Sequence, residues 1–231
     1  LESFVVRRKI SPRGTHDYTS KCYHIIKNGI DYLRTSDFDN GDGKISDYEI
    51  KKYLANIKDD PAKMVLFCIE LYRRRSASID VRALEYIYTL EHIMPKEWTS
   101  EWSDVEIIND GVAMDHATIE AKQFRQAAIE SLGNKTLLTG KLNSTLRNGS
   151  FFKKINGDGP NKPGYGNHTS LSVTREIVDL AQQDPVWDEA HIDARLDNLY
   201  KEFVALWPQY SCEDPDLSQF TKEQLDDPIA L

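Results

Sequence analysis

Apolar residues recur at helical spacing along much of the chain. The spacing predicts helices over residues 22–33, from Ser46 onward and over residues 61–75. Ser46 and Glu49 stand in the Ser-x-x-Glu order of a capping box, which marks the start of a helix. We therefore expect residues 1–80 to form a helical N-terminal region.

Two short runs favour β-structure instead. Residues 83–90 are rich in aromatic and β-branched side chains and predict a strand that ends at Glu91 and His92. Residues 136–139 predict a second strand, and Gly140 opens a further helix. Roughly forty residues separate the two strands, more than a hairpin turn needs. The order is therefore strand, insertion, strand, helix.

The remaining segments complete a mainly helical chain with a small β-hairpin. The pattern predicts a loop over 95–113, a helix over 115–132, a glycine-rich loop over 156–168, and helices over 171–182 and 189–207. We expect a domain over residues 81–210 that carries the hairpin, its helical insertion and the C-terminal helices. Residues 211–231 are expected to form an acidic tail.

Composition narrows the class of protein. The chain has 231 residues, of which 40% are hydrophobic, enough for an ordinary buried core. No apolar run approaches the ~20 residues of a membrane helix, and a signal peptide is not apparent, so we expect a cytoplasmic protein without a membrane partner. The three cysteines are widely spaced, which favours reduced thiols. Because the chain begins at Leu1 rather than Met, we expect it to be a piece of a longer protein.

Charge is unevenly distributed along the chain. The formal net charge of −8 argues against a protein that coats nucleic acid without specificity. Residues 133–175 nevertheless hold seven basic residues against one acidic residue, whereas residues 176–231 hold three against fourteen. This polarity would orient a polyanion toward the middle segment, although a solvated basic face is the simpler reading.

Phosphodiester hydrolysis requires a general base, a divalent cation and a group that holds the phosphate, and a histidine with oxygen-donor ligands meets those needs. His92 stands at the predicted strand end beside Glu91, Asn134 precedes the second strand, and Asn143 lies on the helix that follows. Each of these residues alone is weak evidence. A strand-to-helix turn would bring them together.

The combination resembles an HNH (His-Me finger) nuclease. The motif Glu91-His92-Ile93-Met94-Pro95 is followed by Gly133-Asn134-Lys135-Thr136-Leu137-Leu138, then by Leu142-Asn143-Ser144 and Phe151-Phe152-Lys153-Lys154. It is most similar to the DUF1524 group, which forms the C-terminal part of GmrSD-type restriction enzymes and of SspE-like anti-phage proteins. The likeness covers roughly residues 83–208. It implies a ββα-metal core embedded in a helical domain.

The resemblance also implies roles for individual residues. His92 would be the general base, Glu91 and Asn143 would bind one divalent cation, Asn134 would orient the loop after His92, and Lys154 would contact a substrate phosphate. Magnesium or manganese fits such oxygen ligands better than zinc does. The resemblance and the basic segment together suggest nucleic-acid contacts from Lys135, Lys141, Arg147, Asn148 and Lys153.

A second acidic motif offers a different metal site. The segment from Asp37 through Asp39 and Asp42 to Glu49 resembles an EF-hand calcium loop, but its first half is one residue out of register. An acidic, glycine-rich turn that precedes the helix at Ser46 is the simpler interpretation.

We therefore expect a metal-dependent DNA endonuclease or nickase of a restriction or anti-phage system. A nucleotide-dependent or modification-sensing region would lie outside this chain, which lacks the glycine-rich phosphate loop of P-loop enzymes. The alternatives are a helical calcium-binding interaction module and an HNH scaffold that binds nucleic acid without cutting it.

Overall fold

The computed structural model describes residues 1–14, 17–29, 31–32, 45–77, 84–109 and 111–209. The described residues fall into two compact units. The smaller unit contains helix α2 (Tyr18–Asn28). The larger unit contains the described residues from Leu1 to Gly14 and from Ile45 to Pro208. All the candidate site residues that are described below belong to it.

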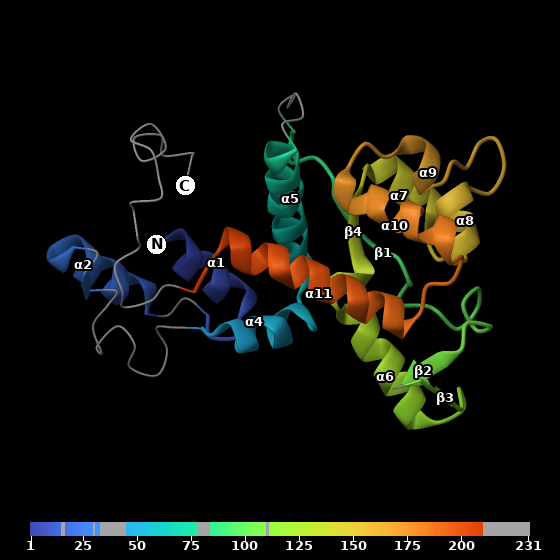
Figure 1. The fold of residues 1–231 in the computed structure, drawn as a ribbon, viewed down its shortest axis with the longest axis horizontal. Helices are drawn as coiled ribbons and strands as arrows, with labels where there is room; N and C mark the ends of the chain where they lie inside the picture. Colours follow the sequence, from blue (N-terminus) through green and yellow to red (C-terminus); the bar gives the residue numbers. More distant parts are fainter. Residues whose placement is uncertain (15–16, 30, 33–44, 78–83, 110, 210–231) are drawn as a thin grey trace. The chain divides into compact units, whose positions relative to one another are not determined.

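The larger unit is mainly helical, as expected, and it contains two small antiparallel sheets where one was expected (Figure 1). Its elements, in chain order, are α1 (Glu2–Ile10), α4 (Asp47–Leu54), α5 (Asp59–Ser76), β1 (Thr89–His92), β2 (Ile107–Asn109), β3 (Val112–Met114), α6 (Ile119–Glu130), the 3-10 helix η2 (Leu132–Asn134), β4 (Lys135–Leu138), α7 (Gly140–Leu146), α8 (Phe151–Asn156), α9 (Tyr165–His168), α10 (Ser172–Gln183) and α11 (Glu189–Leu206). Within the described residues, no helix is both long and apolar enough to span a membrane.

The strand pair β1 and β4 forms the frame of the candidate site. The two strands run antiparallel, so that Glu91 lies opposite Thr136 and His92 lies opposite Lys135. Helix α7 follows β4 directly, and Thr139 caps it by accepting a hydrogen bond from the backbone N–H of Leu142. The predicted order of strand, insertion, strand and helix is confirmed.

Local sequence signals explain several helix starts. Ser46 and Glu49 form the predicted capping box, in which the Ser46 backbone N–H donates to Glu49 Oε2 over 2.9 Å and Ser46 Oγ accepts from the Glu49 N–H. Helix α5 begins two residues before Pro61 and carries two acidic residues in its first turn, where the helix dipole favours negative charge.

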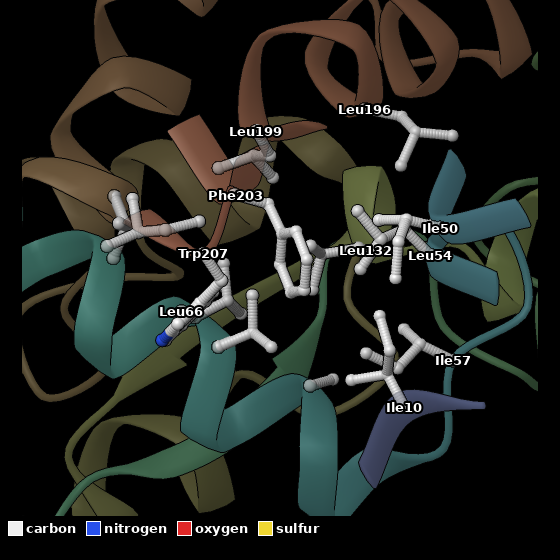
Figure 2. Packing of buried hydrophobic residues seen from close by; sticks show 14 of the residues in the cluster. Ile10, Ile50, Leu54, Ile57, Leu66, Leu132, Leu196, Leu199, Phe203 and Trp207 are labelled. Atoms are coloured by element: carbon white, nitrogen blue, oxygen red, sulfur yellow. The ribbon is translucent and has the colours of Figure 1, made fainter. Parts of the chain in front are cut away.

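Two hydrophobic clusters hold the larger unit together, and α11 contributes to both. Figure 2 shows part of the first cluster, where Phe203 and Leu199 of α11 lie among side chains from α1, α4 and α5. This cluster also includes Leu132 and Leu137, which flank and line the β1–β4 frame. The expected boundary near residue 80 therefore does not separate two cores among the described residues.

Close backbone packing at Gly133 joins η2 to α11. A Cβ atom at this glycine would collide with the carbonyl oxygen of Ile192. Only glycine permits such an approach, and the end of the insertion is thereby fixed against the N-terminal part of α11.

The structure corrects three details of the sequence analysis. The first strand covers only residues 89–92, because β4 supplies hydrogen-bonding partners to four residues. The expected loop over 95–113 contains the second hairpin, β2–β3, which an Asp-Gly pair before Val112 could have indicated. The expected glycine-rich loop contains the short helix α9.

Candidate active site

A groove of about 390 Å³ lies where β1 meets α7. It brings together three of the four residues that the motif singles out, Glu91, His92 and Asn143. The groove is lined by Leu90, Glu91, His92, Pro95, Lys96, Glu97, Asn143, Ser144, Arg147 and Asn148. Two of the expected nucleic-acid contacts, Arg147 and Asn148, are therefore beside the motif residues, and both are exposed.

Glu91 is buried on one side of β1. Its Oε1 atom accepts hydrogen bonds from Lys154 Nζ at 2.5 Å and from the Tyr165 hydroxyl at 3.0 Å. Burial raises the pKa of Glu91, and the positive charge of Lys154 opposes that rise. Glu91 lines the groove, and one of its two carboxylate oxygens is held from α8 and α9.

Lys154 is fully buried, whereas a lysine that contacts a DNA phosphate has to reach the protein surface. Besides Glu91 it donates to the backbone carbonyl of His92 over 2.7 Å. Burial lowers the pKa of Lys154, an effect that Glu91 opposes. The geometry makes this lysine a support for the end of β1 in place of the expected phosphate contact.

His92 lies on the opposite side of β1 from Glu91, as neighbours along a strand do. Its Nε2 atom is 3.5 Å from Asp59 Oδ1 on α5 and makes no hydrogen bond within the described residues. Burial, followed by the nearby charge of Lys135, lowers the pKa of His92 to about 4. The imidazole is therefore neutral near pH 7, the form that a general base requires.

Asn134 is fully buried and bonded through both ends of its side-chain amide. Its Oδ1 accepts from the backbone N–H of Met94 at 2.8 Å and from Trp187 Nε1 at 3.1 Å, and its Nδ2 donates to the carbonyl of Met94 at 2.8 Å. These contacts fix the chain immediately after β1.

Asn143 connects α7 to β1. Its Nδ2 donates to the carbonyl of Leu90 over 2.7 Å and to Thr89 Oγ1 over 3.2 Å. Because the nitrogen makes both bonds, the amide oxygen is the atom through which Asn143 could hold a cation in the groove.

The basic residues of the middle segment differ in their surroundings. Lys141 is exposed, and Lys153 forms a surface ion pair with Glu101 at 2.9 Å. Lys135, by contrast, is fully buried, and its Nζ donates to the carbonyl of Ile57 and to Asp59 Oδ1 over 3.0 Å. Its position does not support the expected nucleic-acid contact, because its ammonium group is used inside the protein.

Two sets of side chains could hold a metal ion. Glu91 and Asn143 offer oxygen donors at the groove, as magnesium and manganese prefer. In a second set, ligand atoms of Asp59, His92 and Glu130 lie within 4.8 Å of one another. The donor chemistry of the first set fits the cation that the resemblance implies.

The EF-hand-like segment lies largely outside the described residues, which exclude Asp37, Asp39 and Asp42. Glu49, the last expected ligand, belongs to the capping box and also pairs with Arg13 at 2.6 Å. Its carboxylate is therefore committed to the start of α4.

Sequence reasoning did not foresee Asp59, Tyr165 or Trp187 at this site. Asp59 and Tyr165 contact the motif from segments far from it in the chain, and no fixed spacing links them to His92 or Glu91. The only signal for Asp59 was its place in an acidic first turn, which occurs in many helices.

Comparison with known proteins agrees with the resemblance. No curated protein and no solved structure gives a significant match to this chain. Residues 31–202 match the family described as "GmrSD restriction endonucleases, C-terminal domain". The match covers most of the chain and takes in every motif residue of the groove, and the chain therefore belongs to the family of GmrSD restriction endonuclease C-terminal domains.

Proposed function

We propose that this chain is an HNH nuclease that hydrolyses DNA phosphodiester bonds with the help of a divalent cation. One observation supports this proposal above the others. Glu91, His92 and Asn143 come from β1 and α7 and line the same groove, next to exposed Arg147. A base, oxygen ligands and a cationic side chain thus lie side by side on a strand-strand-helix frame.

The residues divide the reaction between them. Neutral His92 accepts a proton from the attacking water, and Asn134 keeps the chain after His92 in place through its bonds to Met94. Glu91 and Asn143 would hold a divalent cation, which when bound would supply positive charge beside the phosphate. Arg147 contacts a neighbouring phosphate of the DNA backbone.

A plasmid assay tests this function. Supercoiled DNA is incubated with the protein and magnesium, manganese, calcium or EDTA, beside the variants His92→Ala and His116→Ala. We expect metal-dependent nicking or linearisation that His92→Ala lowers by on the order of 100- to 10,000-fold. His116 does not line the groove, so its replacement should leave the rate unchanged.

The outcomes separate the hypotheses. Full activity of His92→Ala would remove this residue from the role of general base. Binding of DNA without cleavage under any metal would favour the scaffold that binds without cutting. The ratio of nicked to linear product also shows whether one strand or both are cut.

Membership of the family supports a further proposal, on the biological setting. We propose that the nuclease acts in restriction of foreign DNA, together with a nucleotide-dependent or modification-sensing region. Purified chain should consequently show no ATP or GTP turnover of its own.

A further inference from the structure

The surroundings of His92 contain a carboxylate that the motif does not include. Asp59 lies in the first turn of α5, and its Oδ1 is 3.5 Å from His92 Nε2. Nε2 is buried and makes no hydrogen bond within the described part of the chain. A buried ring N–H without an acceptor is costly, and Asp59 Oδ1 is an acceptor within a small movement of it.

The burial of Nε2 also decides which ring nitrogen can meet water. The His92 side chain is 15% exposed and lines the groove, whereas Nε2 is inaccessible to solvent. Nδ1 is therefore the nitrogen that remains to accept a proton from water. It can do so only when the imidazole proton resides on Nε2.

Asp59 is itself held in place. Lys135 Nζ lies 3.0 Å from Asp59 Oδ1, and Lys96 Nζ lies 3.7 Å from Asp59 Oδ2. The buried Lys135 stands opposite His92 in the strand pair, so it links the carboxylate to the frame of the site. An anchored carboxylate can orient a neighbouring imidazole.

A second metal ion is a poorer explanation of this cluster. The Lys135 ammonium lies 3.0 Å from Asp59 and 3.6 Å from Glu130, and Lys96 lies 3.1 Å from Glu130. Two positive charges thus already compensate both carboxylates and would repel a cation.

We infer that Asp59 is a positioning residue for His92. Its carboxylate accepts the Nε2–H of the imidazole and fixes the tautomer in which Nδ1 carries the lone pair toward the groove. A separation of 3.5 Å in the free protein is compatible with this role, because catalytic hydrogen bonds often tighten only when substrate binds. The catalytic part of the inference rests on the proposed nuclease function.

The first test needs no activity. Nitrogen NMR of the imidazole in the full chain reports which ring nitrogen carries the proton, with His92→Ala to assign the signals. We expect the Nε2–H tautomer in the wild type and a shift toward Nδ1–H in Asp59→Asn, because the amide can offer an N–H to Nε2. Asp60→Asn is the matched control, since Asp60 is an exposed acid in the same helical turn. An unchanged tautomer in Asp59→Asn would overturn the inference.

The second test measures cleavage. Asp59→Asn should lower kcat by about 100-fold with little change in KM, whereas Asp60→Asn should match the wild type. Asp59→Glu keeps the acceptor and should recover part of the rate. Equal kcat in the Asn variants of both residues would overturn the inference, and thermal unfolding verifies that each variant is folded.

The two tests keep the failures apart. If the wild type fails to cleave DNA with every metal tested, the proposed function fails. The NMR result still decides whether Asp59 sets the tautomer. A titration with Zn²⁺ tests the competing explanation directly. Coordination of Zn²⁺ by Nε2 in the wild type but not in Asp59→Asn would replace the positioning role by a metal site.

Discussion

Replacement of Lys154 by methionine tests the support of Glu91. The lysine is fully buried, Glu91 is 5% exposed, and their charged atoms are 2.5 Å apart. Methionine keeps most of the aliphatic stem but leaves the carboxylate buried without its cation. Removing one partner of a buried ion pair costs about 3–5 kcal/mol. We take the lower end, about 3 kcal/mol, because the Tyr165 hydroxyl still donates to Glu91 and protonation can neutralise the carboxylate.

Urea unfolding, followed by circular dichroism, measures this loss. For a protein of this size it corresponds to a fall in Tm of roughly 6–12 °C. Lys153→Met is the matched control on the same helix, since Lys153 pairs with Glu101 at the surface and should leave the unfolding midpoint unchanged. The double variant Glu91→Gln, Lys154→Met removes both charges and should recover much of the stability.

Two outcomes would contradict this prediction. Equal midpoints for Lys154→Met and Lys153→Met would mean that the buried ammonium does not stabilise Glu91. A double variant no more stable than Lys154→Met would mean that the loss comes from packing and not from an unpaired charge.

Three further predictions concern packing, substrate binding and capping. Gly133→Ala should lower the free energy of unfolding by about 2 kcal/mol or more, because its Cβ would meet the Ile192 carbonyl. Gly140→Ala is the control and should leave the free energy of unfolding unchanged or raise it, since the nearest atom to its Cβ is 3.7 Å away. Urea unfolding compares the two variants, and equal losses of stability would contradict the clash at Gly133. Arg147→Ala should reduce the slope of log DNA affinity against log salt concentration by about one counterion, whereas Arg147→Lys should keep the slope. An unchanged slope in the alanine variant would mean that Arg147 does not contact a phosphate. Ser46→Ala should cost about 1 kcal/mol in urea unfolding, and no loss would mean that its capping box does not stabilise α4.

Sequence patterns predicted the frame of the site because its signals are local. The helix that starts at Gly140 and the capping box at Ser46 each depend on residues close together in the chain, and each strand of the pair has its own short β-favouring run, although the pairing itself joins distant segments. Glu91, His92 and Asn143 reach one groove once the two strands pair and the helix after the second strand forms.

The same patterns could not predict burial or contacts between distant segments. From the sequence alone, Lys135 and Lys154 are two positive charges of the basic segment. Only tertiary packing shows that both side chains are buried. Lys153, the neighbour of Lys154, remains at the surface because consecutive helical residues face different directions. The contact of Asp59 with His92 depends on how α5 packs beside the strands.

The consecutive positions of Glu91 and His92 explain why the site draws on so much of the chain. Successive side chains of β1 point to opposite sides, so each residue meets a different set of helices. Glu91 is held by Lys154 of α8 and by α9, whereas His92 faces Asp59 of α5. The N-terminal helices therefore contribute to the frame of the candidate site as well as to the core, and a domain that began at residue 81 would leave buried Lys135 without the Asp59 carboxylate.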